Sequence, residues 1–123
     1  MPVRGIRGAT TAVDNTRQHI LEATTELLTH VVQANDLQTA DIAAAFFTTT
    51  PDLDATFPAL AARLMGWTTV PLMGAQEAAV PGSLSLCIRL LLLVNTEKAQ
   101  VDVRNVYEKG ATSLRESVSR DLS

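Results

Sequence analysis

The longest apolar run in the chain constrains the fold more than any other feature. It covers residues 82–96, GSLSLCIRLLLLVNT, with Pro81-Gly82 at its start and Asn95-Thr96 at its end. A short apolar run between turn residues predicts a strand that is buried on both faces, while periodicity alone leaves a buried helix open. We therefore expect a sheet built around residues 82–96.

A charged residue, Arg89, stands in the middle of this apolar run. Burying an unpaired charge costs more than a small domain can offset, so an interior arginine is expected to have an anionic partner. The run contains no acid, so the partner is either an acid from elsewhere in the chain or a bound anion. Two structural explanations compete with a ligand, namely an internal ion pair and a register that turns Arg89 to water.

The amino-acid composition and net charge limit the classes of function that the chain can have. The chain has 123 residues, of which 46% are hydrophobic, and a net charge of −3, values that indicate an ordered chain with a real core. Its basic residues are dispersed and do not alternate with aromatic ones, so we expect no nucleic-acid partner. Only Lys98 and Lys109 are lysine, which leaves eight of the ten basic residues as arginine. Arginine matches carboxylate and phosphate in two-point contacts, which favours a small anionic ligand, although genomic base composition is a competing explanation.

Cysteine and histidine give no sign of a metal or a cofactor. Cys87 is the only cysteine, which excludes an intrachain disulfide and a cysteine metal cluster. His19 and His30 lie far apart on one predicted helix, and we expect both to be ordinary surface residues. No signal peptide opens the chain and no apolar run is long enough to span a membrane, so we expect a cytoplasmic protein without a membrane partner.

The other segments predict an α+β fold. Alternation predicts a first strand, and helical spacing predicts an amphipathic helix from the caps at Asp14–Thr16 to about Gln33. The third segment is ambiguous, because its alanines favour a helix while its phenylalanines and threonines favour a strand; we prefer the strand. The remaining predictions are a short helix, an edge strand, a loop, and a short helix leading into a final strand. The predicted strands cover residues 3–11, 42–50, 67–73 and 82–96, and the predicted helices cover residues 14–33 and 59–65. The loop covers residues 74–77, and the last short helix and strand lie within residues 97–115.

These elements give a mixed sheet of about five strands with one long helix and one short helix. One long helix cannot cover both faces of such a sheet, so a symmetric oligomer is the simplest cover for the other face. We expect a single domain over residues 1–115, and a mobile tail over residues 116–123, which have no apolar face. Arg4 and Arg7 lie three positions apart on the first strand, so at most one of them can face a given site.

The residues available for chemistry favour binding over covalent catalysis. Nucleophile–base pairs, phosphate-binding glycine loops and metal sets are absent from the sequence. What remains is a set of arginines near segment ends, one loop carboxylate and one tyrosine: Arg7, Arg63, Arg89, Arg115, Glu77 and Tyr107. Such a set can bind and orient a small polyanion. Any reaction would depend on positioning and electrostatic stabilisation.

With these residues, the sequence resembles AroH-type monofunctional chorismate mutase, the small trimeric α+β class. The matching stretches run in family order over nearly the whole chain. They are residues 4–11, 50–53, 57–59, Arg63 with Gly66-Trp67, Val70-Pro71, Gln76-Glu77, 87–89, Val106-Tyr107 and Leu114-Arg115. The resemblance implies a pseudo-barrel homotrimer with the sheets in the middle, the helices outside and three active sites at subunit interfaces. It also implies the Claisen rearrangement of chorismate to prephenate, in phenylalanine and tyrosine biosynthesis, without a cofactor.

The resemblance also implies roles for individual residues. Arg89 matches the position that stabilises the negative charge developing on the ether oxygen, so the missing partner of Arg89 would be the substrate. Arg7 would bind a substrate carboxylate, with Tyr107 as a hydrogen-bonding neighbour. Glu77 would accept a hydrogen bond from the ring hydroxyl. The remaining positions would supply apolar walls, contacts beside Glu77 and positive potential at the mouth: Phe57, Leu114, Met73, Gly74, Arg63 and Arg115.

Three positions depart from the family pattern. Gly74 stands where a cysteine is frequent, Leu60 where a lysine is frequent and Met73 where a threonine is frequent. The first change removes a side-chain contact beside Glu77, and the second removes a charge near the mouth. We expect activity to survive these changes, with weaker substrate binding.

Structural explanations remain for each site residue. Glu77 could be a solvated loop acid or the ion-pair partner of Arg89, Tyr107 a core residue, and Arg63 a solvated helix residue. The alternative function is a non-catalytic trimeric module that binds a small anion. The enzyme requires Arg89 to face a cavity together with Arg7, Glu77 and Tyr107, whereas a closed Arg89–Glu77 pair without a cavity would exclude it.

Overall fold

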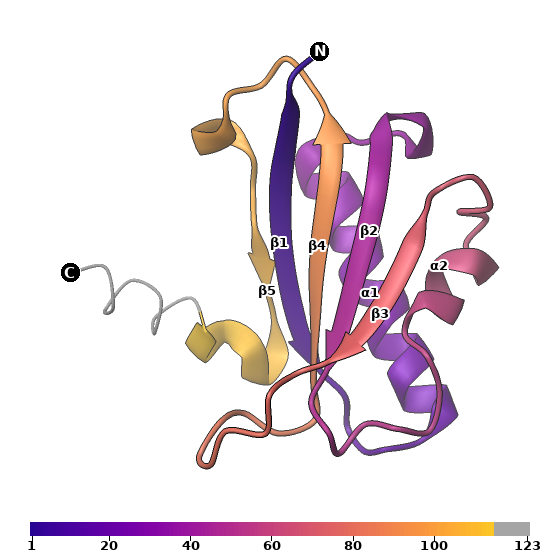
Figure 1. Cartoon of the computed structure of the whole chain (residues 1–123), viewed down its shortest axis with the longest axis vertical. Helices are drawn as coiled ribbons and strands as arrows, with labels where there is room; N and C mark the ends of the chain where they lie inside the picture. Colours follow the sequence, from indigo (N-terminus) through magenta and orange to yellow (C-terminus); the bar gives the residue numbers. More distant parts are fainter. Residues whose placement is uncertain (115–123) are drawn as a thin grey trace.

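The computed structural model describes residues 1–114, which form an α+β fold with one mixed five-stranded sheet (Figure 1). Arg115 and the predicted tail lie outside the described residues. The sheet order is β3-β2-β4-β1-β5. The elements are β1 (Val3–Thr11), α1 (Arg17–Asn35), η1 (Thr39–Asp41), β2 (Ile42–Thr49), α2 (Ala59–Leu64), β3 (Leu72–Gln76), β4 (Cys87–Asn95), η2 (Gln100–Asp102), β5 (Val106–Tyr107) and η3 (Lys109–Ala111). The predicted fold class is confirmed.

Residues 87–95 of the apolar run form β4, the central strand of the sheet, whereas residues 82–86, also predicted as strand, lie in the turn and irregular backbone before it. The strand β4 pairs antiparallel with β1 on one side and with β2 on the other, while β3 and β5 add parallel strands at the two edges. The final strand was predicted, but β5 has only two residues. The ambiguous segment after α1 is the strand β2, since its phenylalanines and threonines find partners across β4 and β3.

Helix α1 covers one face of the sheet and lies behind it in Figure 1. The even-numbered residues of β4, from Ile88 to Val94, are buried on that side with Leu27, Leu28 and Val31 of the helix. Gly8 of β1 permits the close approach, because a Cβ there would lie 3.3 Å from the side chains of Leu27 and Val31. The core of the protomer therefore sits between the sheet and α1.

The opposite face of the sheet has no helix over it among the described residues. The odd-numbered residues of β4 point to that side, and Arg89 and Leu91 are exposed there. The prediction of a strand buried on both faces is thus wrong for the single protomer. Apolar side chains nevertheless gather on this open face, where Met73 is 63% exposed, Val3 51% and Leu91 36%. Such an apolar surface is typical of an interface.

The edge strand β3 begins later than predicted. Trp67 and Val70 are buried core residues that precede it, and the aromatic and β-branched residues of this segment had suggested a strand. Pro71 lacks an N–H group, but its carbonyl accepts a hydrogen bond from the N–H of Ala45 at 2.9 Å, and the ladder starts there. The strand then runs through Gly74 to Gln76, which were predicted as a loop.

Helix ends follow the predicted signals closely. The Thr16 hydroxyl accepts a hydrogen bond from the His19 N–H and caps α1, which ends at Asp36 in the left-handed conformation. Helix α2 is followed by Gly66 with φ of 94°, as expected for a glycine after a helix.

Candidate active site

Cross-strand pairing places four of the predicted site residues in two rows on the open face. Residues directly opposite each other on neighbouring strands project to the same side, so register decides which side chains meet. The first row crosses four strands and contains Arg7, Leu91, Phe46 and Met73. The second row crosses all five strands and contains Tyr107, Ala9, Arg89, Thr48 and Ala75. Arg7, Arg89 and Tyr107 therefore face the same side of the sheet.

A cavity of about 490 Å³ opens between these rows. Its lining includes five of the predicted site residues: Arg7, Glu77, Arg89, Tyr107 and Leu114. Glu77 follows the end of β3, and its N–H donates to the carbonyl of Thr49 at 2.8 Å, which fixes it beside the second row. The cavity thus combines two guanidinium groups, one carboxylate and one phenol with apolar walls. We call it the Arg89 cavity.

The register turns Arg89 out of the core, and Glu77 is its partner. The Arg89 Nε atom lies 3.6 Å from Glu77 Oε1, and the two side chains are 47% and 28% exposed. Charge-assisted hydrogen bonds are shorter, about 2.7–2.9 Å, so this pair is loose. Both structural explanations for Arg89, the internal ion pair and the register that turns it to water, therefore hold in part. The pair borders an open cavity, which is the arrangement that the enzyme requires.

The two arginines of β1 point to opposite faces, as predicted. Arg4 donates from Nε to the carbonyl of Lys98 at 2.9 Å, away from the cavity. Arg7 faces the cavity, and its backbone N–H donates to Asn105 Oδ1 at 2.9 Å. This contact joins β1 to the segment that leads into β5. The backbone around Arg7 is therefore fixed while its guanidinium stays exposed.

A second cavity, of about 700 Å³, gathers three other predicted residues: Phe57, Arg63 and Gly74. We call it the Phe57 cavity. Phe57 is 79% exposed at its rim. Asn15 orders the loop on one side, because its Oδ1 atom accepts hydrogen bonds from the N–H groups of Asp54 and Ala55, both at 3.0 Å.

The protomer therefore divides the predicted site between two cavities. Met73 lies in the first row but lines neither cavity. Arg115 lies outside the described residues. No residue lines both cavities, so the predicted residues do not form one site within the described part of a single chain.

The one cysteine lies beside this site but is not a nucleophile in it. Burial raises the pKa of the Cys87 thiol above its ordinary value, and the nearby Arg89 guanidinium offsets only part of that effect. The thiol is therefore protonated at neutral pH, and a protonated thiol is a poor nucleophile. This agrees with the sequence, which offers no histidine base for it.

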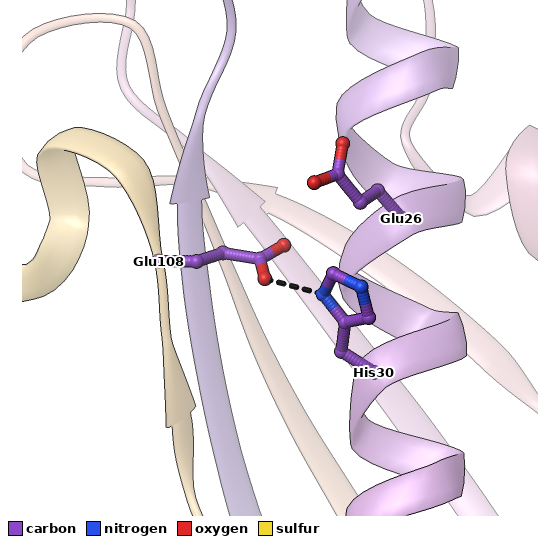
Figure 2. Close-up of side chains that lie close together, drawn as sticks. All are labelled: Glu26, His30 and Glu108. Carbon is purple, nitrogen blue, oxygen red and sulfur yellow. Dashed lines mark hydrogen bonds and ion pairs between the residues drawn. The ribbon is translucent and has the colours of Figure 1, made fainter.

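The sequence did not reveal the contacts of the two histidines. His19 Nδ1 lies 2.6 Å from Asp14 Oδ1, and His30 Nδ1 lies 2.6 Å from Glu108 Oε2. The first contact also lowers the pKa of the Asp14 carboxyl, mainly through its hydrogen bond with His19. Glu26, one turn from His30, completes a group of possible metal ligands, although the sequence had suggested none (Figure 2). Only the spacing of Glu26 and His30 on the helix could have drawn attention to this group.

Comparison with known proteins identifies the family. The family described as chorismate mutase type I matches residues 3–118. The chain belongs to this family. Among curated relatives, chorismate mutase AroH from Thermus thermophilus is 49% identical over 114 residues, 92% of this chain and 93% of that protein. Chorismate mutase AroH from Bacillus subtilis is 41% identical over 120 residues, 97% of this chain and 94% of that protein.

A solved structure of a relative agrees with the fold. Chorismate mutase from Clostridium thermocellum is 50% identical and superposes with a TM-score of 0.87, over 89% of this chain and 97% of that one. The resemblance to the AroH class is confirmed. Within residues 1–114, no helix is long and apolar enough to cross a membrane.

Proposed function

We propose that this chain is a chorismate mutase, an isomerase that converts chorismate to prephenate in aromatic amino-acid biosynthesis. The observation that carries the proposal is the Arg89 cavity, where Arg89, Arg7, Glu77 and Tyr107 meet on one face of the sheet. Family membership and similar length support the same function. The rearrangement is unimolecular, so it needs no nucleophile, and the site provides none.

The proposed role of Arg89 follows from the charge of the transition state. As the C–O bond breaks and the C–C bond forms, negative charge builds on the ether oxygen. A guanidinium fixed near that oxygen stabilises the transition state more than the substrate, and this difference accelerates the reaction. The strand β4 holds the Arg89 backbone between two partner strands, so the charge needs little reorganisation during the reaction.

The other side chains of the Arg89 cavity fit a dicarboxylate with a ring hydroxyl. Arg7 is exposed in the cavity and can make a two-point contact with a carboxylate. Tyr107 faces the same space as a hydrogen-bond donor, and the carboxylate of Glu77 can accept from the hydroxyl. Substrate would therefore replace the loose Arg89–Glu77 contact with closer partners for both groups.

We further propose a homotrimer in which neighbouring copies complete each site. The open face carries exposed apolar residues that need cover, and the predicted site residues divide between two separate cavities of the protomer. The proposed assembly buries the open faces and sets the Phe57 cavity of one copy against the Arg89 cavity of the next. Phe57 and Leu114 would then close opposite sides of the substrate, and Arg63 and Arg115 would attract it.

Of the three departures from the family pattern, Gly74 lines the Phe57 cavity, Leu60 lies on α2 beside it, and Met73 lies on the open face of the sheet. Gly74 leaves room for a side chain, since a Cβ there would lie 3.7 Å from the carbonyl of Phe47, so the missing side chain at this position only enlarges the cavity. Leu60 and Met73 likewise remove polar groups without entering the Arg89 cavity. The proposed catalytic set is thus unaffected.

The test is to incubate the purified wild-type chain with chorismate. We expect chorismate to disappear, as followed by ultraviolet absorbance, and prephenate to be the only product in proton NMR spectra. The rate should not depend on any added nucleotide, metal or thiol reagent. Binding of chorismate without turnover by a folded protein would instead favour the anion-binding module. A cytoplasmic location stays a prediction.

A further inference from the structure

The strand that carries Tyr107 is the least secured element of the Arg89 cavity. β5 has two residues, pairs with β1 alone and forms the edge of the sheet. The segment before β5 is held by the hydrogen bond from the Arg7 N–H to Asn105 Oδ1 and by Asn35 of α1, which bonds to the backbone of Arg104. After β5, the N–H of Glu108 extends the pairing with a hydrogen bond to the carbonyl of Ala9 at 3.1 Å. A two-residue edge strand has too few ladder hydrogen bonds to fix its own position. Something beyond the ladder has to keep Tyr107 in place.

Two side-chain contacts with α1 supply that support, and we call them the β5 anchor. His30 Nδ1 lies 2.6 Å from Glu108 Oε2, which Figure 2 shows as a direct contact between the helix and the segment after β5. Lys109 Nζ lies 3.2 Å from Glu26 Oε2. Glu26 and His30 are one helical turn apart on the same face of α1. Consecutive residues after β5 are therefore paired with consecutive turns of the helix.

Strand alternation links the anchor to the cavity on the other side of the sheet. Tyr107 and Glu108 are consecutive residues in extended backbone, so their side chains point to opposite faces. Tyr107 lines the Arg89 cavity on the open face, while Glu108 points to α1 with its side chain only 17% exposed. Fixing the Glu108 side chain against the helix therefore fixes the direction of the Tyr107 side chain.

Backbone strain at Lys109 indicates that the contacts of the β5 anchor hold this residue in an unfavourable conformation. Lys109 has φ of 53°, a left-handed conformation that is unfavourable for a lysine. Such conformations persist only where surrounding contacts impose them. Here those contacts are the pair with Glu26 and, one residue later, the hydrogen bond from the Gly110 N–H to Thr11 Oγ1 at 3.1 Å. Leu114, another wall of the cavity, follows directly after this turn.

The same group could also be considered a metal site, since the ligand atoms of Glu26, His30 and Glu108 lie within 4.8 Å of one another. Two features favour the anchor instead. The separation of 2.6 Å between His30 Nδ1 and Glu108 Oε2 suits a shared proton but is too short for two ligands of one zinc ion, each about 2.0–2.2 Å from it. Glu26 is moreover already paired with the ammonium group of Lys109.

We propose that His30 and Glu108 are positioning residues for the mutase reaction, which act on the substrate through Tyr107 without touching it. The inference rests on the proposed function. When the anchor is lost, β5 spends part of its time displaced, and only the remaining fraction of the protein binds substrate well. Saturating substrate restores the ordered state. Loss of the anchor therefore raises KM and leaves kcat unchanged.

His30→Ala should raise the KM for chorismate about threefold to tenfold, with kcat within about twofold of wild type. His30→Asn retains an N–H donor near the position of Nδ1 and should recover most of the affinity. The matched control is His19→Ala, which removes an equally short contact to Asp14 at the other end of the same helix and should leave KM unchanged. If His30→Ala only destabilised the fold, a smaller fraction of the protein would be active. The apparent kcat per mole of protein would then fall while KM stayed constant.

A second readout does not depend on activity. Tyr107 is the only tyrosine in the chain, so incorporation of 3-fluorotyrosine gives a single ¹⁹F NMR signal. We expect that signal to broaden or shift in His30→Ala and to return toward wild type in His30→Asn. A KM and a ¹⁹F signal in His30→Ala that match those of His19→Ala would overturn the proposal. So would a wild-type KM that rises with a chelator, since it would indicate a metal site. An inactive wild type would contradict the proposed function instead, while the ¹⁹F result would still test the anchor.

Discussion

Replacing Arg89 with methionine should lower kcat for chorismate by about 10²–10³-fold, the usual effect of removing one preorganised donor that faces developing charge. Methionine retains most of the length and the apolar stem of the side chain, so the wall of the cavity persists. Because Arg89 is 47% exposed, its replacement should leave the fold intact. Steady-state kinetics by ultraviolet absorbance, with circular dichroism spectra of both proteins, would measure both quantities.

Two further variants test whether the effect on kcat comes from the guanidinium at position 89 or from the loss of any positive charge. Arg89→Lys keeps the positive charge but loses the planar fork, so it should retain only part of the lost activity. Arg17→Met removes a guanidinium from the exposed first residue of α1 and should behave as wild type. If Arg89→Met turned over chorismate at the wild-type rate, the electrostatic role of Arg89 would be wrong.

Replacing Leu93 with glutamate should dissociate the oligomer and with it abolish most of the activity. Leu93 lies on the open face between Gly5 and Ala44 of the neighbouring strands, and it lines neither cavity. If copies pack on this face, each brings a carboxylate into an apolar interface, which costs several kcal/mol per charge. We expect monomers by sedimentation velocity, and activity reduced at least about 10²-fold at micromolar protein concentration.

Matched substitutions test whether the effect comes from the interface. Leu93→Met keeps an apolar side chain and should remain a trimer. Val101→Glu introduces the same charge on η2, where the native side chain is already 90% exposed, and should also assemble. A Leu93→Glu protein that sediments as the wild type does would exclude the open face as the interface.

The sequence predicted the strands and helices best where local signals are strong. The caps of α1, the glycine after α2 and the Asn95-Thr96 turn after β4 are all local signals, and each of these elements was found, although β4 starts five residues after the predicted Gly82. The start of β3 was wrong because residues 67–70 are of aromatic and β-branched types that favour strands, while tertiary packing buries Trp67 and Val70 outside the sheet. Burial of β4 was overestimated for the protomer because a continuous apolar run does not distinguish the face that packs on α1 from the face that stays open.

The family resemblance named the candidate site residues and expected Arg7, Glu77, Arg89 and Tyr107 to meet, but the residue patterns alone could not show that they do. Arg7 and Arg89 were singled out by residue type and family resemblance, yet only the register of β1 against β4 shows that they face the same side. The division between the Arg89 cavity and the Phe57 cavity also depends on tertiary structure. The contact between Glu108 and His30 was not predicted, because the two residues are 78 positions apart in the sequence.

The central claim is that each active site combines the Arg89 cavity of one copy with the Phe57 cavity of another, and mixed oligomers test it most directly. Arg89→Met subunits lack a working Arg89 cavity. Phe57→Asp subunits lack a working Phe57 cavity, because the new carboxylate repels a dianionic substrate. Each protein alone should be nearly inactive. Subunits unfolded and refolded together in equal amounts should recover about one quarter of wild-type activity, because that share of sites pairs two intact cavities. A mixture that exchanges subunits but shows no more activity than its two components would contradict the shared site.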